Sequence, residues 1–156
     1  MDLKILENRF GAKETSGLRG NPLLLVDRER FHEALLFLKT ADGFLFDMLI
    51  DLTAVDYIQE TPRFELVYQL YSLKLNHRLE VRVRLSAEDP VADSVTDLWK
   101  TANWYEREVF DLFGIRFTGH PDLKRILLAE SFEGHPLRKD YPMEKRQKIP
   151  VTIEKP

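Results

Sequence analysis

Two histidines stand in the same short context, Gly-His-Pro, at positions 120 and 135. Histidine combined with Asp or Glu is the residue set of zinc sites and of general acid–base pairs. The sequence offers four carboxylates for such a set: Asp111, Asp122, Glu133 and Asp140. A proline after each histidine, however, favours extended backbone and directs the imidazole through a turn, where it hydrogen-bonds to nearby groups or at an interface. We therefore expect hydrogen-bonding histidines, and we keep a stand-alone metal or acid–base enzyme using His120 and His135 as the alternative.

Other catalytic patterns are missing from the sequence. It contains no glycine-rich phosphate loop, no nucleophile elbow and no dinucleotide fingerprint. It also contains no Cys, which excludes disulfides, thiol nucleophiles and Cys-ligated iron–sulfur clusters from these 156 residues. Asp47, Asp51 and Asp56 lack the loop glycine and the spacing of a calcium site, so strand-edge or turn roles are expected. The sequence therefore predicts no catalytic residue, no metal and no cofactor on this chain.

The histidines follow a segment that predicts a helix over residues 103–113. Asn103 and Glu106 have the spacing of a capping box, and Gly114 follows the last periodic residue. Glu106 also projects onto the apolar face of this helix. That face comprises Tyr105, Val109, Leu112 and Phe113, with Phe110 at its edge.

The opposite face of this helix carries charges and one tryptophan. Arg107 and Asp111 have the i, i+4 spacing of a solvated ion pair, which would make this face ordinary surface. Trp104 lies among these charges, and an aromatic ring in a charged face indicates a second contact surface. Such a surface would meet either a partner or the chain's own tail.

Residues 115–156 are predicted to form an extended C-terminal arm. Five of the eight prolines lie beyond residue 120, and the apolar residues there come in isolated packets. Such packets cannot build a core, yet ordering the backbone costs about 1–2 kcal/mol per residue, so they must be buried against a surface. Residues 134–156 hold six basic and three acidic residues, which leaves −6 on the remainder of a chain of net charge −3. The basic end is either solvated or docked on an acidic partner, and the net charge argues against nucleic acid.

Arg, His and carboxylates alternate from the predicted helix into the arm. This alternation favours charge-assisted pairing across a protein interface, with Trp104, Tyr105, Phe117 and Phe132 as desolvated anchors. The interface candidates are Trp104, Glu106, Arg107, Asp111, Phe117, His120, Arg125, Phe132, His135, Arg138, Asp140 and Tyr141.

Residues 1–114 predict an α+β domain of two layers. Apolar periodicity indicates helices at 2–10, 27–43 and 89–102, besides the one at 103–113. Strands are expected within 12–20 and at 23–26, 44–58, 64–75 and 79–85, with a hairpin turn at Asn76-His77. This order predicts a mixed, largely antiparallel five-stranded sheet with helices on one face. No apolar run approaches the roughly 20 residues of a membrane span, and no signal peptide precedes the domain.

Three blocks carry a resemblance to a known family. They read D-L-T-A-V-D-Y at 51–57, E-R-E-V-F-D-L-F at 106–113 with His120 and Lys124 after it, and F-E-G-H-P-L-R-K-D-Y-P at 132–142. Together they resemble the 30 kDa (C) subunit of respiratory complex I, the NADH:quinone oxidoreductase. The resemblance extends over roughly residues 28–146.

This resemblance implies a structural subunit in the hydrophilic arm of a proton-translocating complex. The 30 kDa subunit of that family packs on the quinone-site 49 kDa (D) subunit, with its C-terminal segment along that partner. Electrons would pass from NADH through FMN and iron–sulfur clusters to quinone, with all of these cofactors on partner subunits. The chain is then expected at the cytoplasmic side of the bacterial inner membrane, as a peripheral protein. A corresponding subunit of a related membrane-bound hydrogenase-type complex is the alternative.

Overall fold

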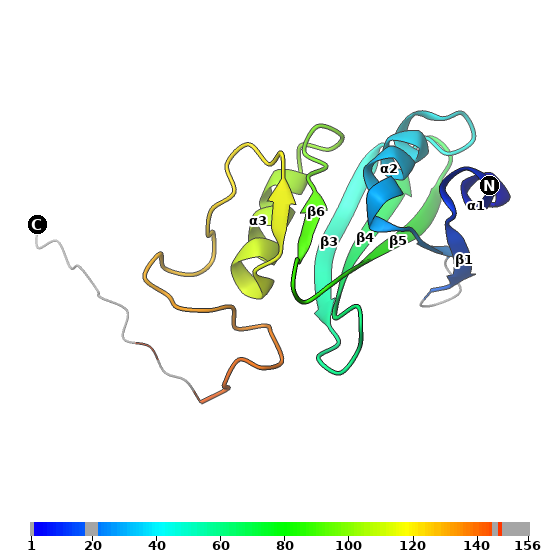
Figure 1. Cartoon of the computed structure of the whole chain (residues 1–156). Coiled ribbons are helices and arrows are strands. Elements are labelled where there is room, and N and C mark those ends of the chain that lie inside the picture. The colour runs from blue at the N-terminus through cyan, green and yellow to red at the C-terminus, as the bar shows by residue number, and fades with distance from the viewer. Residues whose placement is uncertain (1, 18–21, 145–146, 148–156) are drawn as a thin grey trace, which may run out of the picture.

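The computed structural model describes residues 2–17, 22–144 and 147, and is built around a five-stranded sheet (Figure 1). The strands lie in the order β1-β2-β5-β4-β3. β2 and β5 are parallel and every other neighbouring pair is antiparallel, which confirms the predicted mixed, largely antiparallel sheet. Their bounds are β1 Lys13–Ser16, β2 Pro22–Leu25, β3 Met48–Asp56, β4 Phe64–Ser72 and β5 His77–Leu85.

Helices pack on one face of this sheet, as the sequence predicts. They are α1 (Lys4–Phe10), α2 (Phe31–Thr40), which follows a short 3₁₀ turn at Arg28–Arg30, and α3 (Ala102–Phe113). Alternate residues of β4 point to this side, and the Phe31 ring of α2 lies 4.8 Å from the ring of Tyr68. These alternate residues join the helices in one hydrophobic core; they are Phe64, Leu66, Tyr68 and Leu70.

The other face of the sheet carries paired charges. Arg82 lies 2.9 Å from Glu65 on the neighbouring strand and 2.5 Å from Glu80 on its own strand. Because side chains alternate along a strand, the charged positions of β5 fall on this face and the apolar ones in the core. The turn before β5 is also as predicted, with Asn76 at φ 50°.

The helix predicted over residues 89–102 is wrong. Residues Val91–Asp93 form a short strand, β6, which pairs in parallel with β7 (Arg116–Thr118), and turns follow up to α3. The backbone N–H of Ser94 continues this pairing by donating to the Thr118 carbonyl at 2.8 Å. A partner strand about 25 positions away thus overrides the local helical pattern, because tertiary pairing outweighs weak intrinsic propensity.

Helix α3 begins at Ala102, one residue before the prediction, and its start differs in kind. The N-cap residue Thr101 makes no side-chain cap hydrogen bond, and Glu106 turns inward, so the predicted capping box is not formed. The predicted end is confirmed. Gly114 adopts φ 71°, the left-handed conformation typical of a residue that closes a helix.

The chain remains in the core beyond Gly114, since Ile115 and Phe117 are both buried. After β7, the described residues 119–144 and 147 contain no helix or strand. Figure 1 shows this segment, yellow to orange, running past α3 and returning beneath the sheet. Within the described residues, no helix is long and apolar enough to cross a membrane.

Candidate functional site: helix α3 and its strap

Asp111, near the end of α3, binds the segment that follows β7; residues 122–140 are here called the strap. The Asp111 side chain is fully buried, and its Oδ1 accepts a hydrogen bond from the Arg125 guanidinium at 2.6 Å. Its Oδ2 accepts three consecutive backbone N–H groups at 3.0, 2.8 and 2.9 Å, from Ile126, Leu127 and Leu128. Burial alone would raise the pKa of Asp111, but these donors outweigh it and hold the pKa below its usual value.

The strap also satisfies the carbonyl groups at the end of α3. The last carbonyls of a helix have no partner within the helix, and cations near them interact favourably with the helix dipole. Here two side chains and one backbone N–H of the strap donate to them: His135 to Asp111 O at 2.9 Å, Leu137 N to Leu112 O at 3.1 Å, and Arg138 to Phe113 O at 2.5 Å.

Gly114 permits this close approach. A Cβ at this position would lie 2.6 Å from the His135 ring and 2.7 Å from the Arg138 guanidinium. The glycine is therefore required both by its left-handed backbone and by the strap that packs over it.

A second carboxylate fixes the far end of the strap to the sheet. Asp56, at the end of β3, pairs with Arg63 through two contacts of 2.7 Å and accepts the backbone N–H of Lys139 at 2.8 Å. Arg63 in turn reaches Asp140 at 2.9 Å. The hydrogen bond from Arg63 is the main reason why the pKa of Asp56 lies below its usual value. Two of the three sequence blocks, 51–57 and 132–142, meet at this point.

Glu106 is buried on the opposite side of α3 and contacts a different segment. Its carboxylate accepts the Ser94 hydroxyl and the Val95 N–H, both at 2.7 Å, and so ties α3 to the residues after β6. Burial raises the pKa of Glu106 to about 7. Its predicted place on the inner face is confirmed, but it lies inside this chain and presents no surface to a partner.

Arg107 bonds the strap instead of Asp111. Its guanidinium donates to the carbonyls of Lys124 and Arg125 at 3.2 Å each, so the predicted Arg107–Asp111 pair is not formed. The same guanidinium lies 5.2 Å from the Trp104 ring, which is 60% exposed. Of the two expectations for this face, the chain's own tail covers Arg107 and Asp111, while Trp104 remains open to solvent.

The two histidines hydrogen-bond locally, in line with the first interpretation of the Gly-His-Pro motifs. Nε2 of His120 lies 3.2 Å from the Asn103 carbonyl and its Nδ1 accepts the Asp122 N–H, while His135 meets the Asp111 carbonyl. Burial lowers the pKa of His135. Across the part of the chain that the structure describes, no three His, Asp or Glu side chains are grouped so as to hold a metal ion.

The remaining candidates divide between core and surface. Phe117 is 4% exposed, so it is not an exposed anchor; its place in β7 turns it into the core. The rings of Phe132 and Tyr141 stack on each other at 6.0 Å, within the second half of the segment after β7. Most of the basic end noted in the sequence (Lys145, Arg146, Lys148 and Lys155) lies outside the described residues.

Two exposed strap residues were not among the candidates. Leu127 is 61% and Leu137 is 48% exposed, although each lies beside an anchored residue of the strap. Their signal was present in the isolated apolar packets of the arm. Which member of a packet faces outward depends on the Asp111 contacts, and the sequence does not display these.

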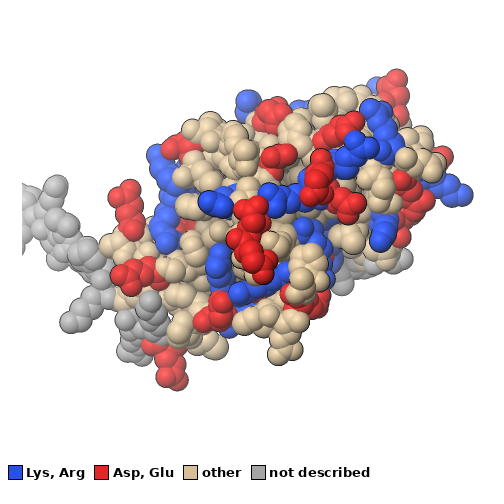
Figure 2. Space-filling model, in the orientation of Figure 1, with Lys and Arg blue, Asp and Glu red and all other residues tan. Residues whose placement is uncertain are grey.

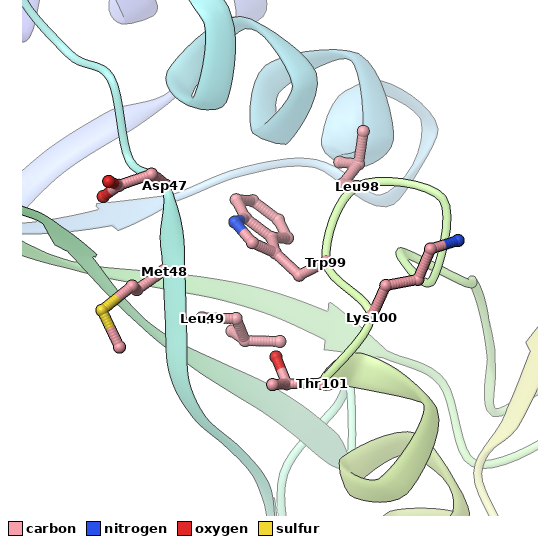
Figure 3. Close-up of a pocket in the computed structure, with 7 residues that line it drawn as sticks. All are labelled: Asp47, Met48, Leu49, Leu98, Trp99, Lys100 and Thr101. Carbon is pink, nitrogen blue, oxygen red and sulfur yellow. The ribbon is translucent and has the colours of Figure 1, made fainter.

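A pocket of about 220 Å³ lies between the start of β3 and the turns before α3 (Figure 3). Asp47 and Lys100 point to opposite sides of it, so they do not form an acid–base pair. Figure 2 shows Lys and Arg interspersed with Asp and Glu over the viewed face, with no broad area of one sign. The pocket lining is Asp47, Met48, Leu49, Leu98, Trp99, Lys100 and Thr101.

Solved structures share this fold. A trypsin-resistant fragment of Nqo5 aligns at TM-score 0.70 with 39% identity, covering 78% of this chain and 96% of the fragment. A chain of the membrane-bound sulfane sulfur reductase, an archaeal respiratory membrane complex, aligns at TM-score 0.76 with 27% identity, covering 90% of this chain and 83% of that one. The fold is therefore that of a protein class found in respiratory assemblies.

Sequence comparison identifies the family. Residues 24–147 match the model of the 30 kDa subunit of respiratory-chain NADH dehydrogenase, and the chain belongs to this family. A 30 kDa (C) subunit of NADH-quinone oxidoreductase from Rhizobium meliloti is 49% identical over 134 residues, which are 85% of this chain and 73% of that protein. The corresponding NADH-quinone oxidoreductase subunit of Trichlorobacter lovleyi is 47% identical over 142 residues, 89% of this chain and 86% of that protein.

Proposed function

We propose that this chain is the 30 kDa subunit of an NADH-quinone oxidoreductase and serves as a structural, non-catalytic subunit of its hydrophilic arm. The observation that supports this most strongly is the family match over residues 24–147, with relatives named as this subunit at 47–49% identity. The complex would transfer electrons from NADH to quinone and translocate protons. FMN and the iron–sulfur clusters would be held by partner subunits, since this chain has no Cys to ligate a cluster.

The proposed partner is the quinone-site 49 kDa subunit, and the proposed contact is the outer side of α3 and the strap. Most polar groups there are used within the chain: Asp111 by Arg125 and three N–H groups, His135 and Arg138 by helix carbonyls. What these elements leave exposed is apolar, namely Trp104, Leu127 and Leu137. Exposed aromatic and aliphatic side chains on a rigid support are typical anchors of subunit interfaces.

This assignment places the chain at the cytoplasmic side of the bacterial inner membrane, as a peripheral protein held there by its partners. A corresponding subunit of a related membrane-bound complex is a second candidate, because the archaeal sulfane sulfur reductase chain matches 90% of this chain. The identity favours the first candidate, at 49% against 27%.

Affinity purification tests the proposal. The chain, tagged at its N-terminus and expressed in its own host, should bring down the 49 kDa subunit together with flavin- and iron–sulfur-containing subunits, identified by mass spectrometry and by NADH–quinone activity. Cross-links from Lys124 and Lys139, both exposed on the strap, should then reach the 49 kDa subunit. Recovery of the chain alone, or with the subunits of a hydrogenase or sulfur reductase, would contradict the assignment. Cross-links that reach only other subunits would contradict the choice of partner.

A further inference from the structure

The strap has no regular secondary structure, yet it is bound at three places to its own chain. Arg125 and the three following N–H groups meet Asp111, His135 to Arg138 meet the end of α3, and Lys139 meets Asp56. These contacts join residues 14 to 83 positions apart. A segment that only a partner could order would not be expected to meet so many groups of its own domain.

Asp111 is the centre of these contacts. Three successive backbone N–H groups that converge on one point form a concavity that binds anions. In this chain the concavity at residues 126–128 is filled by the buried Asp111 carboxylate, with Arg125 beside it. If the strap moved away, a buried anion would lose all four donors at once, and such a loss is strongly unfavourable.

Other contacts near this point are weaker candidates for holding the strap. Arg107 reaches the carbonyls of Lys124 and Arg125 at 3.2 Å each, and is itself a partly exposed side chain. The ion pair of Lys124 with Asp122 is exposed on both sides, and such pairs contribute little. Asp111 alone combines full burial with four short hydrogen bonds.

We propose that Asp111 is a latch that keeps the strap closed over the end of α3 in the free chain, before any partner binds. The sequence predicts an arm that a partner surface orders; the latch makes its ordering a property of this chain. A closed strap holds Leu127 and Leu137 outward in a fixed arrangement, so a partner would meet a preformed surface and assembly would not have to order the segment. The latch concerns the free chain and would stand whichever complex the chain joins.

Hydrogen exchange followed by mass spectrometry tests the latch on the purified full chain. In the wild type, the amides of residues 126–128 should exchange about 100-fold more slowly than those of an unstructured peptide. Asp111→Asn should raise their exchange rate about tenfold or more, while peptides from β4 remain protected. Asp122→Asn is the matched control, because Asp122 is an exposed carboxylate beside the strap, and it should leave the rates unchanged.

Arg125→Gln covers the case in which Asp111→Asn disturbs the whole fold, which loss of β4 protection would reveal. It removes one donor from the strap side only, and it should accelerate exchange at 126–128 with β4 still protected. Strap amides that exchange at the unstructured rate in the wild type would overturn the latch. So would wild-type rates in Arg125→Gln together with wild-type rates in Asp111→Asn.

Discussion

Helix α3 carries two fully buried carboxylates, and their surroundings differ. Glu106 faces the residues after β6 and receives two neutral donors, the Ser94 hydroxyl and the Val95 N–H. Asp111 faces the strap and receives three N–H groups and a guanidinium. Burial raises the pKa of Glu106 to about 7, whereas the donors around Asp111 overcome burial and lower its pKa.

The difference shows that burial alone does not decide the charge of an interior carboxyl group. What decides it is the number and charge of the donors that replace water. Glu106 lies where a neutral acid is tolerated, between elements that the core already holds together. Asp111 lies where an anion is required, because it binds a segment with little apolar area to bury.

The largest effect is expected from removing the anion. Asp111→Ala should lower the free energy of unfolding by about 4 kcal/mol, because a buried guanidinium and three N–H groups lose their acceptor. Urea denaturation at pH 7 measures this loss. Asp122→Ala, which removes an exposed carboxylate, should change stability by less than about 0.5 kcal/mol. A loss below about 1 kcal/mol for Asp111→Ala would mean that the two carboxylates do not differ as described.

The second effect concerns pH and Glu106. A carboxyl group whose pKa is higher in the folded than in the unfolded chain binds its proton more tightly when folded. Its contribution is therefore fully present below pH about 4.5 and is lost as the pH rises through about 7. The loss should be on the order of 3 kcal/mol, since each unit of pKa corresponds to about 1.4 kcal/mol.

Glu106→Gln isolates this contribution. The amide oxygen can accept the Val95 N–H and the amide nitrogen can donate to Ser94, so the neutral side chain fits the same place. The variant should be more stable than the wild type above pH 7 and about equal to it near pH 4.5. Asp111 acts in the opposite direction, because its lowered pKa makes its contribution disappear as the pH falls below the usual Asp range. A variant whose stability parallels the wild type from pH 4.5 to 8 would refute the raised pKa.

Half of this comparison was visible in the sequence. The helical period places Glu106 on the apolar face, and its burial follows. Its donors could not be predicted, because Ser94 and Val95 belong to a stretch whose pattern favours helix, whereas the structure places them after a strand paired with residues 116–118. The sheet was predictable because the alternation in β4 and β5 is strict and their hairpin is local.

The surroundings of Asp111 were not predictable from local pattern. Its spacing from Arg107 suggests a surface pair, since nothing near it in sequence indicates that residues 125–128 return to it. Contacts between residues 14 to 17 positions apart, made largely by backbone N–H groups, depend on the path of the chain and have no side-chain signature. The same reason explains Phe117: three residues of β7 are too few to show the alternation that turns it inward.

A smaller effect is expected at the joint between α3 and the strap. Gly114→Ala should destabilise the chain by about 1–2 kcal/mol, through left-handed backbone and contact with His135 and Arg138. Gly43→Ala is a matched control, since it has φ 86° with open space around its Cβ, and it should show the backbone part alone. Thermal denaturation compares the two. Equal losses would mean that the strap does not press on position 114.

The smallest effect on the free chain is expected at Trp104, on the outer side of α3 and half a turn before Glu106. Its ring is 60% exposed and contacts the Arg107 guanidinium, so Trp104→Ala should change the free energy of unfolding by less than about 0.5 kcal/mol. The chain's second tryptophan is the control: Trp99 is 4% exposed and donates to the Phe46 carbonyl, and its replacement by Ala should cost about 3–5 kcal/mol. If Trp104 is an interface anchor, Trp104→Ala should still weaken recovery of partner subunits in affinity purification, by about 30-fold in affinity. A loss above about 1 kcal/mol in the free chain would assign Trp104 to the support of the strap, and undiminished partner recovery would remove it from the interface.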